Sequence, residues 1–209
     1  MISQEGVLPL SSSLDAVGVI GSQVADCATL FDVIRDRPGS RRLPLPATRI
    51  RLGLVSDYVS SDLEPDVKET LERSIRALKA GGVAVELIPL PALLEIPDMM
   101  REATFPAIEA YAWHKAYIES GRHAEYDPRV LTRIRLGEHM KAAAYFRLIE
   151  RRRTFINTVW SETQGIDALL WPTVPMSAPS IASLKTDDAY HTANARVLRN
   201  STVANLLDA

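Results

Sequence analysis

Residues 50–88 carry the pattern that most restricts how this chain can fold. Ile50–Val55 is a short apolar run that favours a strand, and residues 83–88 form a second such run. Between them, Pro65 suits the first turn of a helix, an apolar stripe follows at helical spacing, and Gly81-Gly82 suits the helix end. A strand, a helix and a strand in this order predict a right-handed βαβ unit with parallel strands.

The rest of the chain is predicted to be mostly helical. Apolar spacing favours helices over residues 22–35, 98–118, 128–136, 140–162 and 189–207. Pro106 is a point at which the second of these helices can be interrupted. Ser22 is expected to cap the first helix, with Asp26 in its first turn. Residues 167–171 favour a third strand that Pro172 ends, so the pattern predicts an α/β fold with more helix than strand.

Composition restricts the class of protein. The chain has 209 residues, of which 46% are hydrophobic and 24% are charged, as is usual for a globular domain. Its net charge of −2 gives no general attraction to nucleic acid or to an anionic membrane. No apolar run approaches the roughly 18 residues of a membrane span. A single cysteine, Cys27, and a first segment unlike a secretion signal predict a cytoplasmic protein.

The residues alone contain no common catalytic motif. There is no Gly-rich phosphate loop, no GxGxxG and no Gly-x-Ser-x-Gly turn. Four histidines lack the spacing of metal ligands, so neither a metal nor another cofactor is expected: His114, His123, His139 and His191. Cys27 lies on the apolar stripe of a predicted helix without a basic neighbour, so we interpret it as a core thiol.

Four segments, taken in order, resemble those of the amidase signature family. The first is residues 6–30, GVLPLSSSLDAVGVIGSQVADCATL, in which the matching positions are Ser11, Ser13, Leu14, Asp15, Gly18, Val24 and Asp26. The other three are residues 133–137 (RIRLG), residues 167–175 (DALLWPTVP, with Ala178-Pro179 continuing the pattern) and residues 198–205 (LRNSTVAN). The resemblance therefore spans almost the whole chain.

This resemblance implies a partial amidase-signature fold of the α/β class. The expected architecture is a mixed β-sheet flanked by helices, rich in helix. It forms one partial domain over residues 1–209. That domain is expected to lack the N-terminal portion with the family's catalytic signature and the final C-terminal strands.

The family hydrolyses carboxamides or, in its amidotransferase members, releases ammonia from glutamine. Its Ser-Ser-Lys triad uses a neutral lysine, which takes a proton from the nucleophilic serine through a second serine. Backbone N–H groups hold the developing oxyanion. In the family this triad precedes the segment that residues 6–30 resemble, and no lysine of this chain matches its context. The resemblance therefore implies no catalytic residue in this chain and no activity of the chain alone.

Two functions remain open at this point. The first is a fragment of an amide hydrolase, which would act on a small-molecule amide when the missing half is supplied. The second is a non-catalytic pseudo-amidase that serves as a binding or regulatory protein. Because half a sheet leaves strand edges and apolar helix faces uncovered, we also expect self-association or a complementing N-terminal half as partner.

Most of the matching residues are interpreted as structural. A serine nucleophile needs a base within hydrogen-bond reach, and the resemblance supplies none to Ser11 or Ser13. We therefore expect the hydroxyls of both serines, together with the Asp15 carboxylate, to anchor a loop by binding nearby backbone donors. Gly18 and Asp26 belong to the same structural motif. In the second half, a structural turn is expected from Pro172, Thr173 and Pro175.

Arg133 is the one candidate for substrate binding. In amidotransferase-like members, an arginine in this motif faces the substrate's carboxylate, a bidentate role that suits a guanidinium. The alternative is a helix-surface arginine that pairs with Asp127 or Glu138. Because most helix arginines are solvated, the residue type alone favours this second interpretation.

Overall fold

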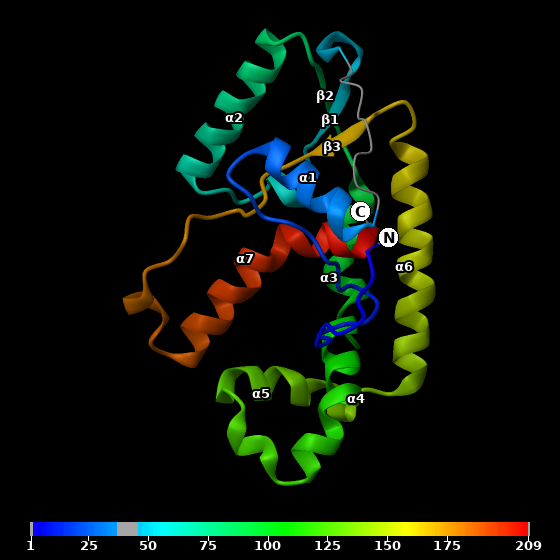
Figure 1. The fold of residues 1–209 in the computed structure, drawn as a ribbon, viewed down its shortest axis with the longest axis vertical. Coiled ribbons are helices and arrows are strands. Elements are labelled where there is room, and N and C mark those ends of the chain that lie inside the picture. Colours follow the sequence, from blue (N-terminus) through cyan, green and yellow to red (C-terminus); the bar gives the residue numbers. More distant parts are fainter. Residues whose placement is uncertain (1, 37–45, 209) are drawn as a thin grey trace.

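A computed structural model describes residues 2–36 and 46–208 (Figure 1). Its helices and strands follow the order α1 (Val24–Ile34), β1 (Arg51–Val55), α2 (Pro65–Ala80), β2 (Ala84–Ile88), α3 (Ile96–Met99), α4 (Phe105–Glu119), α5 (Pro128–Arg135), α6 (Ala142–Glu162), β3 (Ala168–Leu170) and α7 (Asp187–Leu207). Short 3₁₀ helices join several of them. The helix-rich α/β class expected from the sequence is confirmed.

The three described strands form one sheet in the order β2-β1-β3. Both pairs are parallel, and Leu54 of β1 lies opposite Leu87 of β2 and Leu170 of β3. The predicted β1–α2–β2 unit is therefore present. The resemblance implied a mixed sheet, but every strand pair among the described residues is parallel. The reason is that helical segments connect each strand to the next and return the chain to the same end of the sheet.

Helix α2 begins and ends at the residues that its sequence indicates. Pro65 lies at its first position, where no backbone N–H is needed. The C-cap is Gly81, and Gly82 follows with a φ of 88°, which a residue without Cβ adopts readily. The two ends of α2 thus agree with the local sequence signals that predicted them.

Two helix predictions are wrong in detail. Residues 98–118 form two helices, α3 and α4, rather than one. Helix α4 starts anew because the Thr104 side chain accepts a hydrogen bond from the Ala107 N–H at 3.3 Å, and Pro106 falls in the first turn. At the start of α1, the N-cap is Gln23 rather than Ser22, and no side chain caps the helix.

The main core lies where α3, α6 and α7 meet the carboxyl ends of the strands. Its most buried side chains are Val55, Val59, Leu90, Leu93, Phe105, Leu148, Val159, Val203, Leu206 and Leu207. A second, smaller cluster joins α4 to α5 through Ala110, Ile118 and Ile134. These two clusters connect elements that extend from β1 to α7.

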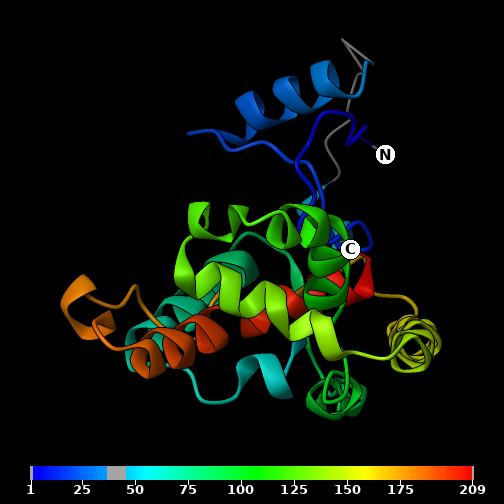
Figure 2. The same ribbon diagram turned by 90° about the horizontal axis from the view of Figure 1, so that it is seen from below.

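Much apolar surface stays uncovered outside this core. The chain exposes 13729 Å², whereas a compact monomer of its mass, 23.1 kDa, is expected to expose about 9,700 Å². Leu87 in the sheet is 68% exposed, although parallel sheets are usually covered on both faces. Figure 2 shows α1 standing apart from the body of the molecule. Cys27 on this helix is half-buried and lies outside the core in which we expected it.

Candidate functional site

The serine segment, residues 6–18, is held by one carboxylate of α4. Ser11 Oγ donates to Glu109 Oε2 at 2.7 Å, and the Ser13 N–H donates to the same oxygen at 2.9 Å. Ser13 Oγ donates to Glu109 Oε1 at 2.5 Å, and the Tyr145 hydroxyl from α6 donates to it at 2.6 Å. Four donors thus converge on a single side chain, and they fix the loop to two helices at once.

The four donors also set the ionisation of Glu109. Burial by itself raises the pKa of this carboxyl, but the hydrogen bonds from Ser13, Tyr145 and Ser11 outweigh it and hold the pKa below its ordinary value. Burial and the neighbouring carboxylate raise the pKa of Tyr145. The hydrogen bonds therefore hold the two serine side chains and the Glu109 carboxylate in one fixed arrangement.

Asp15 stabilises the same loop by accepting hydrogen bonds from its backbone. Its Oδ2 accepts hydrogen bonds from the N–H groups of Leu10 at 2.9 Å and Ser11 at 3.0 Å. The structure therefore brings Ser11, Ser13 and Asp15 together around one turn. It does not include the other two positions of the motif in this contact: Gly18 is exposed with open space around it, and Asp26 is exposed in the first turn of α1.

Arg152 of α6 joins the serine segment to the end of α7. Its guanidinium donates to the carbonyl oxygens of Ser13 at 3.3 Å, Asn205 at 3.0 Å and Leu206 at 2.9 Å. The same group lies 5.5 Å from the centre of the Phe105 ring. Carbonyls at a helix C-terminus lack partners within the helix, so an arginine placed there satisfies α7 and the loop together.

The proline-rich turn after β3 is fixed by a buried amide. Asn200 is 0% exposed, and its Nδ2 donates to the carbonyl oxygens of Val59 at 2.9 Å and Pro172 at 2.7 Å. The carbonyl of Pro175, itself buried, accepts from the Glu64 N–H at 2.9 Å. These contacts connect the carboxyl ends of β1 and β3, the edge at which open α/β sheets usually bind ligands.

Thr173 lies on the exposed side of that turn, with its side chain open to solvent. Beside the turn, Arg199 donates to the Ser61 carbonyl at 2.7 Å and lies 5.7 Å from the Tyr58 ring centre. Burial raises the pKa of Tyr58, and the positive charge of Arg199 counteracts part of this rise.

The segment Arg133–Gly137 serves packing at two of its positions. Ile134 is buried in the small cluster between α4 and α5. A Cβ on Gly137 would lie 2.1 Å from the Ala107 carbonyl oxygen, so only glycine allows this close approach. Arg133 points to solvent, and no ion pair among the described residues includes it; Asp127, one of its two expected partners, caps α5 instead.

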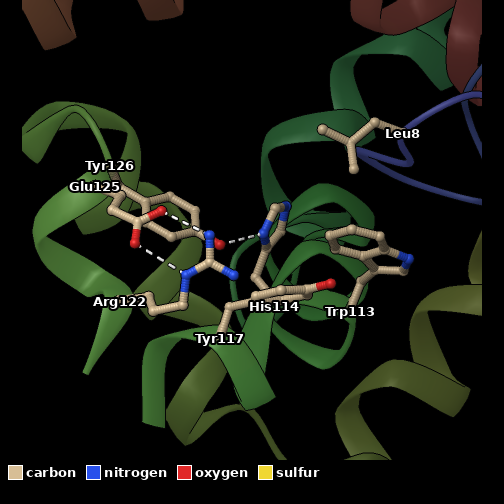
Figure 3. A pocket seen from close by; sticks show the side chains of 7 residues that line it. All are labelled: Leu8, Trp113, His114, Tyr117, Arg122, Glu125 and Tyr126. Carbon is tan, nitrogen blue, oxygen red and sulfur yellow. Dashed lines mark hydrogen bonds and ion pairs between the residues drawn. The ribbon is translucent and has the colours of Figure 1, made fainter. Parts of the chain in front are cut away.

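A pocket of about 300 Å³ opens between α4 and the 3₁₀ helix Arg122–Glu125 (Figure 3). We call it the aromatic pocket. Its lining residues are Leu8, Trp113, His114, Tyr117, Arg122, Glu125 and Tyr126. The rings of Trp113 and Tyr117 stack with centres 5.7 Å apart, and His114 Nδ1 lies 2.6 Å from the Tyr126 hydroxyl. Arg133 does not line this pocket.

No group of three or more His, Cys, Asp or Glu side chains within residues 2–36 and 46–208 is arranged to hold a metal ion. In the same part of the chain, no helix is both long and apolar enough to cross a membrane.

Comparison with known proteins identifies the family. A family model described as Amidase matches residues 1–209. This chain belongs to the amidase family. The match covers the serine segment, the Arg133–Gly137 segment and the proline-rich turn.

Curated relatives of this amidase-family chain have diverse names. The 2-amino-5-chloromuconic acid deaminase of Comamonas testosteroni is 31% identical over 97% of this chain and 44% of its own length. A glutamyl-tRNA(Gln) amidotransferase subunit from Symbiobacterium thermophilum is 30% identical over 90% of this chain and 45% of its own length. The chain therefore spans less than half the length of these relatives.

Solved structures show the same fold. A crystal structure of an amidase matches with a TM-score of 0.79 and 21% identity, over 99% of this chain and 46% of that one. A glutamyl-tRNA(Gln) amidotransferase subunit from Thermotoga maritima matches with a TM-score of 0.68, at 21% identity, over 99% of this chain and 46% of that one. The described residues thus form part of the fold of this amidase family.

Sequence reasoning missed Glu109 and Arg152, the two side chains that hold the serine segment. A signal for Glu109 was present, because it is an acidic residue on the otherwise apolar first half of α4. Nothing in the sequence marks Arg152 among the three consecutive arginines of α6, Arg151 to Arg153. The aromatic pocket was also missed, although Trp113 and Tyr117 have the four-residue spacing that places two rings on one helix face.

Proposed function

We propose that this chain is the C-terminal part of an amide hydrolase whose catalytic triad lies in residues outside it. The supporting observation is that the hydroxyls of Ser11 and Ser13 both donate to Glu109, a carboxylate that its lowered pKa makes a weaker base, which we interpret as an anchor. The chain also spans only 44–46% of its relatives. On this proposal it is inactive alone and forms one partial domain.

The proposed reaction is cleavage of a carbon–nitrogen bond with release of ammonia. The names of the relatives support this class, since they include a deaminase, an indoleacetamide hydrolase and an amidotransferase. In the assembled enzyme, a serine from the other portion attacks the carbonyl, a lysine accepts its proton through a second serine, and backbone N–H groups hold the oxyanion. The C–N bond then breaks, and the proton returns from the lysine through the second serine to the leaving nitrogen, which departs as ammonia. Water hydrolyses the remaining acyl-serine ester to the carboxylic acid and free serine.

In that enzyme, this chain supports the catalytic portion and binds the substrate. Residues 6–18 dock on Glu109 and Arg152. This contact fixes the position at which the catalytic portion would join this chain. Arg133, whose guanidinium has no ion pair among the described residues, is the proposed ligand for a substrate carboxylate. We further propose a cytoplasmic location, in agreement with the single cysteine of the sequence.

The test measures ammonia release from a panel of small carboxamides. The chain is assayed alone, mixed with the N-terminal portion of the Comamonas testosteroni relative, and fused behind that portion. We expect release by the fusion or the mixture and none by the chain alone. A fusion with its triad serine changed to alanine is the matched control, because it keeps the same surface without the nucleophile.

Two results would contradict the proposal. Turnover by the chain alone would show that a catalytic group lies within it. A fusion that is folded by circular dichroism but releases no ammonia would favour the second candidate, a non-catalytic binding protein. The aromatic pocket is the observation that favours this second candidate, since it is a site for a ligand that needs no triad.

A further inference from the structure

Another pocket, of about 290 Å³, lies between α6 and the segment that runs from the 3₁₀ helix Pro91–Glu95 into α3. We call it the α3–α6 pocket. It shares no lining residue with the aromatic pocket. Two of its lining side chains are apolar and nearly buried, since Met99 is 6% exposed and Phe155 is 5% exposed. The pocket therefore has an apolar floor.

Two ion pairs fix how the walls of this pocket face each other. Arg151 Nη2 lies 2.9 Å from Asp98 Oδ2, and Arg147 Nη2 lies 2.6 Å from Glu102 Oε2. As the acidic residue moves forward along the chain by about one turn, its arginine moves back by one turn. The two walls are therefore antiparallel, and Figure 1 shows the chain descending from α3 to α4 and rising again along α6.

The same register places Glu95 opposite Thr154. Glu95 lies three residues before Asp98, and Thr154 lies three residues after Arg151. Both Glu95 and Thr154 line the pocket. Where the two neighbouring positions pair an acid with an arginine, this position has an acid and a threonine. Among the described residues, the Glu95 carboxylate accordingly has no ion pair and no hydrogen bond.

The other charges at the pocket favour a cation as guest. The lining includes two carboxylates, Glu95 and Glu150, and one guanidinium, that of Arg151. This guanidinium is bound to Asp98 twice, since its Nη1 also donates to the Asp98 carbonyl oxygen at 3.2 Å. Glu150 has a long ion pair with Arg153, at 3.8 Å between exposed side chains. The pocket thus combines a carboxylate that lacks a partner with an apolar floor.

We propose that the α3–α6 pocket binds a primary alkylammonium group, with the ammonium on Glu95 and the alkyl chain over Met99 and Phe155. An ammonium group only donates hydrogen bonds, and both the Glu95 carboxylate and the Thr154 hydroxyl accept them. An alkyl chain covers apolar surface while its charged end stays near water. A free aliphatic amine and the lysine side chain of another protein share this chemistry. The site does not depend on amide hydrolysis.

The test measures binding of n-butylamine, which is protonated at pH 7, to the intact chain by saturation-transfer difference NMR. Butan-1-ol tests the need for the charge, and butyrate tests its sign. We expect saturable binding of n-butylamine, weaker binding of butan-1-ol and none of butyrate. Glu95→Gln should weaken n-butylamine binding about fivefold, as expected for a partly exposed ion pair. Glu69→Gln is the matched control, because Glu69 is exposed on α2, outside the pocket.

Thr154→Arg is a second variant, which places a basic side chain of the chain itself opposite Glu95. It should abolish n-butylamine binding, because the arginine takes the place of the guest. Both positions are exposed, so both variants should fold, and circular dichroism verifies this. Nα-acetyl-lysinamide distinguishes the two sources of the group. Tighter binding of this compound than of n-butylamine assigns the site to a lysine of another protein, and the reverse assigns it to a free amine.

Three results would overturn the proposal. The first is a folded chain that does not bind n-butylamine. The second is binding of butyrate or butan-1-ol as tight as that of n-butylamine. The third is binding of n-butylamine to Glu95→Gln and Thr154→Arg with the affinity of the unaltered chain.

Discussion

Two sets of apolar side chains in this molecule have opposite surroundings. In the core, Leu148 and Leu206 on α6 and α7 are at most 2% exposed. In the first 36 residues, Leu8 is 67% exposed, Val24 is 87% exposed and Ile20 is 99% exposed. Both sets consist of large apolar side chains, but only the first is covered by the rest of the described residues. An apolar pattern thus indicates that a segment will be covered, without showing which surface covers it.

The largest effect is expected from truncation inside the core. Leu206→Ala should lower the free energy of unfolding by about 2–5 kcal/mol, because it leaves a cavity that its neighbours cannot fill. Ile20→Ala, the matched change in the exposed set, should alter it by less than about 0.5 kcal/mol. Urea unfolding followed by circular dichroism measures both. Equal losses would show that Ile20 is buried in solution and would break the comparison.

Two glycines, Gly137 in a close contact and Gly18 in the exposed segment, extend the comparison to the backbone. Gly137→Ala should destabilise the chain by about 1–3 kcal/mol or more, since its Cβ would meet the Ala107 carbonyl oxygen at 2.1 Å. Gly18→Ala in the exposed segment should cost little, because an added Cβ there meets nothing within 4 Å. The midpoints of thermal unfolding report the difference. A tolerated Gly137→Ala would mean that α4 and the turn at Gly137 are not in close contact.

Weakening the hydrogen bonds between Glu109 and the serine segment is expected to have an intermediate effect on stability. Glu109→Gln should lower the free energy of unfolding by about 1–2 kcal/mol near pH 7, because it weakens charge-assisted hydrogen bonds to Ser11, Ser13 and Tyr145. The pKa of Glu109 is lowered in the folded chain, so its contribution is complete above the unfolded value of about 4.3. The difference between the two proteins should therefore shrink as the pH falls below that value.

Urea unfolding of both proteins between neutral and acidic pH measures this difference. Ser12→Ala is a suitable control, since Ser12 is exposed and lies between the two anchored serines. A difference that stays constant down to the lowest pH would show that the carboxylate charge contributes nothing to the anchor.

The smallest effect on stability should accompany a clear effect on association. Polar replacement of the exposed set, Leu8→Ser with Ile20→Ser and Val24→Ser, should change the free energy of unfolding by less than about 0.5 kcal/mol per site. It should nevertheless reduce self-association measured by sedimentation velocity, because it removes three exposed apolar side chains. Ile181→Ser is the control, as Ile181 is 91% exposed in the 3₁₀ helix Ile181–Leu184, outside the first 36 residues. A monomeric unaltered chain would contradict the expectation.

Features set by local interactions were predicted from the sequence, whereas contacts between distant residues were not. The bounds of β1, α2 and β2 were predicted to within a residue because Pro65, Gly81 and the short apolar runs act locally. The restart of α4 was missed because the Thr104 cap competes with an apolar pattern that continues through it. The contact of Ser11 with Glu109 joins residues 98 positions apart, and no local pattern encodes such a pairing.

Arg152 has a consequence for the order in which the chain folds. Its guanidinium joins Ser13 to the end of α7, and the contact with Ser13 closes a loop of 139 residues. Closing so long a loop costs chain entropy before any contact compensates for it, so such contacts form late. The serine segment should therefore be among the last parts to dock. During synthesis from the N-terminus, Glu109 and Arg152 must both be made before this segment can dock on them.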